Sequence, residues 1–84
     1  MTKQLCSLAV GKGATVINNT SCGSIRRRLL DIGLTEGTYV KCLFKSPFGD
    51  PTAYKIRGAV IALRKEDSKK IIIAENSGGD ALWD

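Results

Sequence analysis

Residues that could carry out acid–base, nucleophilic or metal chemistry are few in this chain. It has 84 residues, with three cysteines and no histidine, so the most common general base and metal ligand is missing. The acidic residues of the first 74 positions are scattered: Asp31, Glu36, Asp50, Glu66 and Asp67. Catalysis requires a nucleophile with a base, a pair of carboxylates or an open metal site. The sequence therefore predicts no enzymatic activity.

The three thiols have two interpretations. The cysteines are widely spaced, at Cys6, Cys22 and Cys42, and no two of them form a C-x-x-C motif. This spacing favours reduced thiols in a cytosolic protein. In the first interpretation Cys42 is a small apolar residue of the core, and the other two have no special role. In the second, the three converge from separate segments and bind a transition metal together with oxygen ligands. The spacing does not decide between them.

A basic surface is the other chemical feature. The 13 lysines and arginines outnumber the 8 acidic residues, for a net charge of +5, and Arg26, Arg27 and Arg28 form the densest cluster. This cluster is either a solvated helix face or a contact surface for an acidic partner or phosphates. Nucleic-acid binding would require exposed aromatic rings beside it, and only Tyr39 and Phe48 qualify. We expect no nucleic-acid partner.

The apolar spacing becomes helical in one place, immediately before Gly33. Ile25, Leu29 and Ile32 recur at i, i+4 and i+7, so they predict one helix face packed against a core. Gly33 predicts the end of this helix in a left-handed conformation. Leu34 would then fold back onto Leu29, as in a Schellman motif.

Five short strands are predicted around this helix. Each is apolar or alternating and is bounded by glycine, proline or charged residues. They cover residues 14–17, 38–45, 52–57, 59–64 and 71–74. Closing so few strands into a barrel removes their unpaired edges. The sequence therefore predicts a mainly β fold, a small barrel of about five strands with one α-helix between the first and second strands.

In the second predicted strand and the loop after it, the question is which side chains face the core and which face solvent. Alternation places Val40, Cys42 and Phe44 on the inward face. Residues 46–51 contain both prolines of the chain, which predict a turn. Phe48 lies near the tip of this loop, either exposed there or tucked beneath the barrel as a plug.

Length and composition indicate one domain. We expect it to cover residues 1–76, with a flexible tail at residues 77–84. No apolar run approaches the roughly 20 residues that span a bilayer, and the first residues do not have the pattern of a signal peptide. We therefore expect a cytoplasmic protein.

Two spaced motifs carry a resemblance to a known family. Residues 27–38 read R-R-L-L-D-I-G-L-x-x-G-T, and residues 49–58 read G-D-P-x-x-Y-x-I-R-G. Together with L-x-x-L-x-x-G at residues 5–11 and I-x-I at residues 71–73, they resemble the FeoA family of bacterial ferrous iron transport systems. The resemblance covers about residues 5 to 74. The domain is also similar to the C-terminal module of iron-dependent repressors of the DtxR type.

The resemblance implies an SH3-like barrel and a function. It implies a non-catalytic cytosolic accessory protein that binds and modulates the membrane transporter FeoB through its cytosolic GTPase portion. Contact with the inner membrane would then occur only through this partner. The alternative is a metal-responsive regulatory module that binds Fe²⁺ or another divalent transition metal, although the chain differs from the repressors in having no histidine.

Partner binding is predicted at the loop of residues 46–51 and on the helix. Contact surfaces of SH3-like barrels are built from loops near aromatic side chains. The arginines would supply the electrostatic half of the same or an adjacent surface. The predicted residues are Arg26, Arg27, Tyr39, Phe48 and Asp50. No metal ligands are assigned, and the oligomeric state is left open.

Overall fold

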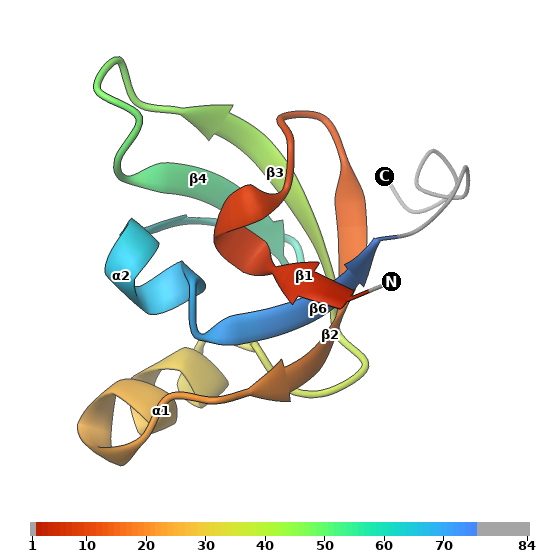
Figure 1. Ribbon diagram of the computed structural model, residues 1–84, viewed down its shortest axis with the longest axis vertical. Coiled ribbons are helices and arrows are strands. Elements are labelled where there is room, and N and C mark those ends of the chain that lie inside the picture. The colour runs from red at the N-terminus through yellow and green to blue at the C-terminus, as the bar shows by residue number, and fades with distance from the viewer. Residues whose placement is uncertain (1, 76–84) are drawn as a thin grey trace.

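A computed structural model describes residues 2–75 of the chain, which form a curved sheet and short helices, with α1 at one end of the molecule (Figure 1). The elements, in chain order, are β1 (Thr2–Gln4), the 3-10 helix η1 (Leu5–Ser7), β2 (Gly13–Asn19), α1 (Gly23–Asp31), β3 (Tyr39–Lys45), β4 (Thr52–Ile56), β5 (Ala59–Leu63), α2 (Lys65–Ser68) and β6 (Ile71–Glu75). The predicted mainly β fold is confirmed. The predicted tail, residues 77–84, lies outside the described residues.

All strand pairs are antiparallel, in the order β1-β6-β2-β3-β4-β5. The described sheet thus has six strands instead of about five, and α1 follows its second strand instead of its first. The additional strand is β1, whose sequence Thr-Lys-Gln has no apolar pattern. It forms because Lys3 and its neighbours pair with β6, a contact between the two ends of the described chain that local sequence does not encode.

The core lies inside the curve of the sheet and receives side chains from almost every element. Its buried members are Leu5, Leu8, Ala14, Val16, Leu29, Leu34, Val40, Cys42, Tyr54, Ile56, Leu63, Ile71 and Ile73. Burial raises the pKa of the Tyr54 phenol to about 12. The Tyr54 hydroxyl donates a hydrogen bond of 3.4 Å to the Leu5 carbonyl, which links β4 to η1.

The end of α1 follows the prediction. Gly33 has a φ of 107°, and its N–H donates to the Leu30 carbonyl at 3.0 Å. The Leu34 N–H donates to the Leu29 carbonyl, also at 3.0 Å, which completes a Schellman motif. Leu29 and Leu34 are both fully buried. A Cβ on Gly33 would lie 2.8 Å from Cδ of Arg57, so a larger residue would have to displace this side chain as well as strain the backbone.

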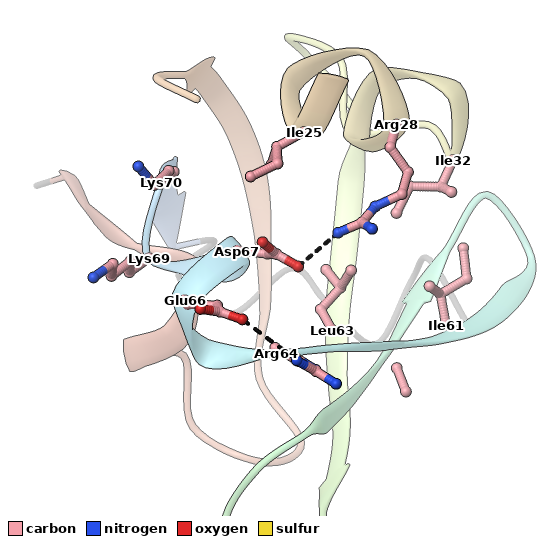
Figure 2. A pocket seen from close by; sticks show the side chains of 11 residues that line it. Ile25, Arg28, Ile32, Ile61, Leu63, Arg64, Glu66, Asp67, Lys69 and Lys70 are labelled. Atoms are coloured by element: carbon pink, nitrogen blue, oxygen red, sulfur yellow. Dashed lines mark hydrogen bonds and ion pairs between the residues drawn. The ribbon is translucent and has the colours of Figure 1, made fainter. Parts of the chain in front are cut away.

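The predicted inward face of α1 is only partly correct. Leu29 is buried and Ile32 packs against the core, but Ile25 is 39% exposed. The reason is that α1 lies at one end of the molecule (Figure 1), and residues 23–28 of its first turns are exposed. Ile25 instead faces the space between α1 and α2 (Figure 2).

The prediction that Phe44 faces inward is wrong. Val40 and Cys42 are fully buried, but Phe44 is 58% exposed. The pairing of β3 with β4 passes from Cys42 opposite Tyr54 to Phe44 opposite Ala53. Leu43 is therefore the extra residue of a β-bulge, and one extra residue sends the next side chain to the other face.

The loop between β3 and β4 leaves its aromatic side chain in solvent. Phe48 is 95% exposed, so its alternative placement as a plug beneath the barrel is wrong. The Gly49 N–H donates to the Ser46 carbonyl at 2.8 Å, a tight turn that points the tip of the loop outward.

A two-residue turn joins β4 to β5. Arg57 and Gly58 have φ values of 50° and 82°, as a type I′ turn requires, and Ile56 pairs with Ala59. The predicted strand of residues 52–57 therefore ends one residue earlier, and Gly58 is part of the hairpin turn.

Candidate protein-binding groove

A groove of about 870 Å³ lies between α1, β5 and α2 (Figure 2). Its floor is apolar, with Ile25 of α1 and Ile32, the residue after α1, facing Ile61 and Leu63 from β5. Charged side chains from α2 and the ends of β5 and β6 surround this floor. An apolar floor inside a charged rim is typical of a protein-binding surface, because burial supplies affinity and the rim supplies specificity.

An ion pair crosses the groove and joins its two helices. Nη2 of Arg28 donates to Oδ2 of Asp67 at 2.9 Å (Figure 2). The Asp67 side chain is only 11% exposed, whereas that of Arg28 is 64% exposed. Two residues earlier in α1, Nη1 of Arg26 donates to the Asn19 carbonyl at 2.7 Å. These two arginines hold the helix in place over the groove.

The rim of the groove carries more positive than negative charge. Its cations are Arg28, Arg64, Lys69 and Lys70, and its anions are Glu66 and Asp67. The pair between Arg64 and Glu66 is 3.6 Å long and both side chains are more than half exposed, so it screens little of this charge. The rim therefore attracts acidic groups.

The wall of the groove formed by β5 is an unusual edge strand. All five residues of Ala59–Leu63 are apolar, yet only Leu63 is buried, and Val60 is 62% exposed. Within residues 2–75, β5 pairs only with β4. Natural proteins usually protect exposed edges with charge, proline or a covering segment. An apolar edge without such protection indicates a surface that another segment covers.

The residues predicted from the sequence to bind a partner lie in separate places. Arg26 and Arg27 are exposed on α1, whereas Phe48 and Asp50 lie in the loop between β3 and β4. This loop and α1 occupy opposite ends of the long axis of the molecule (Figure 1). Oδ1 of Asp50 accepts a hydrogen bond of 2.9 Å from the Lys65 N–H, so this carboxylate attaches the loop to the start of α2.

Tyr39 lies in a third location. It is half-buried at the start of β3, and a Cβ on Gly13 would overlap with its ring. A smaller pocket of about 430 Å³ adjoins it and is also lined by Lys55 and Arg57. The structure therefore does not gather the predicted residues into one local site.

The cysteines do not form a metal centre with their surroundings in the described part of the chain. Cys6 is half-buried, Cys22 is exposed and Cys42 is buried in the core. Burial raises the pKa of the Cys42 thiol, with a smaller opposing effect from Lys45. Residues 2–75 contain no group of three or more cysteine, aspartate or glutamate side chains placed to hold a metal ion.

Sequence reasoning missed most of the groove. The available signal was residues 59–63, which are continuously apolar and do not alternate. Such a run is typical of a fully buried strand. Only the strand order shows that β5 lies at an edge and that Ile61 and Leu63 meet α1 there.

No helix within residues 2–75 has the length and apolar character needed to cross a membrane.

Comparison with known sequences identifies relatives of this fold. The model of the FeoA domain matches residues 3–75. An Fe(2+) transport protein A/Fe(2+) transporter FeoB fusion protein of Porphyromonas gingivalis is 31% identical over 68 residues. The match covers 81% of this chain and 8% of the fusion protein, so the chain spans a small part of that relative.

Comparison with solved structures gives the same family. The FeoA protein of Chlorobium tepidum has a TM-score of 0.83 and 31% identity, with 89% of this chain and 71% of that chain covered. FeoA of Stenotrophomonas maltophilia, described as an SH3 domain protein and solved with zinc, has a TM-score of 0.75 and 27% identity over 88% of this chain and 89% of that chain.

A more distant likeness concerns the fold alone. A manganese-dependent transcriptional repressor is 19% identical, with a TM-score of 0.80 over 89% of this chain and 37% of the repressor. The resemblance to one module of such repressors is thus confirmed, as is the SH3-like fold. With the family model matched over residues 3–75 and the fold shared with solved relatives, the chain belongs to the FeoA family.

Proposed function

We propose that this chain is a non-catalytic accessory component of a bacterial ferrous iron uptake system and that it binds and modulates the cytosolic GTPase portion of FeoB. The observation that carries the proposal is the fused relative, in which a FeoA sequence and a FeoB transporter form one polypeptide. Fusion keeps two partners together at high effective concentration, which is useful when they act in contact. The proposal places the chain in the cytoplasm, at the inner membrane through its partner.

The surface that we propose for this contact includes Arg26, Arg27, Tyr39, Phe48 and Asp50. Phe48 supports it, because a ring that is 95% exposed adds nothing to the core and can bury its area only against a partner. Arg27 supports it as well, since it is an exposed cation beside two others on α1. Because these residues lie at both ends of the molecule, the partner would have to contact an extended face.

Binding is tested by titrating the protein with the purified cytosolic portion of FeoB from the same bacterium. We expect Phe48→Ala and Arg27→Glu each to weaken binding by about tenfold, the loss of one good contact. Val10→Ala and Lys12→Glu are matched controls, since both residues are exposed and lie outside the proposed surface. Neither control should change the affinity measurably.

The thermal midpoints of all four variants should stay close to that of the parent, because surface substitutions change stability by less than about 0.5 kcal/mol. If the parent does not bind the cytosolic portion of FeoB, the proposed function is wrong. If it binds and both test variants bind equally well, the partner uses another surface.

A further inference from the structure

We propose that β5 and the groove beside it bind an extended segment of the partner, which adds a strand to the sheet. Alternate side chains of this segment would be apolar and enter the groove, and acidic side chains would meet its basic rim. The inference rests on the proposed function, because the segment is taken to belong to the cytosolic portion of FeoB. It adds a binding mode and a location that differ from the loop of residues 46–51.

The main chain of β5 has hydrogen-bonding groups that an added strand can pair with. The turn at Arg57 and Gly58 makes Ile56 and Ala59 a hydrogen-bonded pair, and such pairs alternate along antiparallel strands. The amide and carbonyl groups of Ile61 therefore point toward β4. Those of Val60 and Ala62 point away from it, and β5 has no other strand neighbour within residues 2–75. These groups can bond a strand added at the edge.

The side chains of β5 indicate which residues of an added strand would face the groove. Neighbouring strands place their side chains in register, so an added strand would direct every second residue to the same face as Ile61 and Leu63. That face is the groove floor, where Ile25 and Ile32 lie opposite (Figure 2). A polar side chain that entered this space would give up its hydrogen bonds to water without compensation, so apolar side chains are favoured here.

The charge of the rim indicates which kind of chain binds in the groove. Arg64 and Lys69 are exposed at the α2 side of the groove. Arg28 extends over it from α1, but its charge is already paired with Asp67. A second copy of this chain paired through its own β5 would bring a second set of these cations close to the first. An acidic segment of a different protein instead neutralises them. Charge complementarity therefore favours a partner segment over self-pairing.

Amide hydrogen exchange, followed by NMR, tests the main-chain step. In the free protein, the amides of Val60 and Ala62 should exchange rapidly. With the cytosolic portion of FeoB at about 100 times its Kd, their exchange should slow by up to about 100-fold, since only the free fraction exchanges. The amides of Ile61 and Leu63 are internal controls, because they are already bonded to β4 and should change little.

A charge reversal tests the electrostatic step. Lys69→Glu should weaken binding of the same partner by about tenfold and reduce its dependence on salt concentration. Lys12→Glu makes the same change at an exposed lysine that does not line the groove, so it should bind like the parent.

The outcomes separate the two proposals. Protection of Val60 and Ala62 on binding, together with the loss of affinity in Lys69→Glu, supports the inference. If the parent binds FeoB but these amides stay unprotected and Lys69→Glu binds normally, the inference is overturned and the proposed function stands. Protection that already exists in the free protein and grows with its concentration would identify a second copy as the occupant, which also overturns it. If the parent does not bind, both proposals fail.

Discussion

β5 and β6 are similar in length and apolar content but lie in opposite environments. Each has five residues, with the sequences Ala-Val-Ile-Ala-Leu and Ile-Ile-Ile-Ala-Glu. β6 lies between β1 and β2, and its residues Ile71 and Ile73 have no exposed surface. β5 pairs only with β4 in the described sheet, and Val60 is 62% exposed. The position of a strand in the sheet, and not its hydrophobicity, decides how much of it is buried.

The two edges of the described sheet differ in the same way. β1 has the polar sequence Thr-Lys-Gln, and Lys3 pairs with Glu75 of β6 at 3.0 Å. This edge carries the charge that discourages further strand pairing. β5 carries no charge and adjoins an apolar groove. One edge is thus suited to solvent and the other to a partner.

The largest effect is expected in the core beside β6. Ile73→Ala should lower the free energy of unfolding by about 2–5 kcal/mol, because it removes a fully buried side chain and leaves a cavity. Val60→Ala on β5 is the control and should cost less than about 1 kcal/mol. Denaturant titration measures both. Equal losses would show that β5 is as buried as β6.

A smaller effect, dependent on pH, is expected at Tyr54 on β4, next to β5. Burial raises the pKa of this phenol from 10.0 to about 12. The phenol of the unfolded chain therefore ionises first, so stability is complete below pH 10 and falls as the pH rises toward 12. The loss should reach about 2–3 kcal/mol, from about 1.4 kcal/mol for each pKa unit.

Unfolding measured from pH 9 to about pH 12 tests the effect of Tyr54. This range covers the phenol pKa of the unfolded chain, 10.0, and that of the folded chain, about 12, and the stability of the fold should fall between them. Tyr54→Phe is the control, since it removes the ionising hydroxyl and keeps the ring. The variant should lose this part of the pH dependence and retain what the lysines contribute. A parent and variant with parallel profiles would show that Tyr54 is accessible and that the open part of the sheet extends from β5 into β4.

The smallest effect is expected at the two ion pairs of the groove. Arg28→Ala should destabilise the fold by about 1 kcal/mol, because the Asp67 carboxylate that it leaves behind is largely buried. Arg64→Ala is the matched control, and its exposed partner Glu66 should make the cost close to zero. A double-mutant cycle for each pair separates these values. A coupling for Arg64 as large as that for Arg28 would contradict the buried position of Asp67.

Local sequence predicted the elements whose conformation is determined within a few residues. The end of α1 is the clearest example, since Gly33 and Leu34 complete the Schellman motif through contacts with the preceding helical turn. The two motifs of residues 27–38 and 49–58 also led to the family, and in this chain they contain the Schellman motif, the turn at Arg57 and Gly58, and buried core residues. Of the groove, the sequence indicated only the basic character of α1.

Tertiary structure decided the remainder. The bulge at Leu43 turned Phe44 outward, and β1 formed only through its pairing with β6. The exposure of β5 depends on which strand lies beside it, a relation among segments that are distant in the chain. The groove is the result, because Ile25, Ile61 and Asp67 are brought together from two helices and an edge strand. The sequence determined each residue's chemistry and its local turn, whereas sheet order, which arises from long-range pairing, determined which residues face a partner.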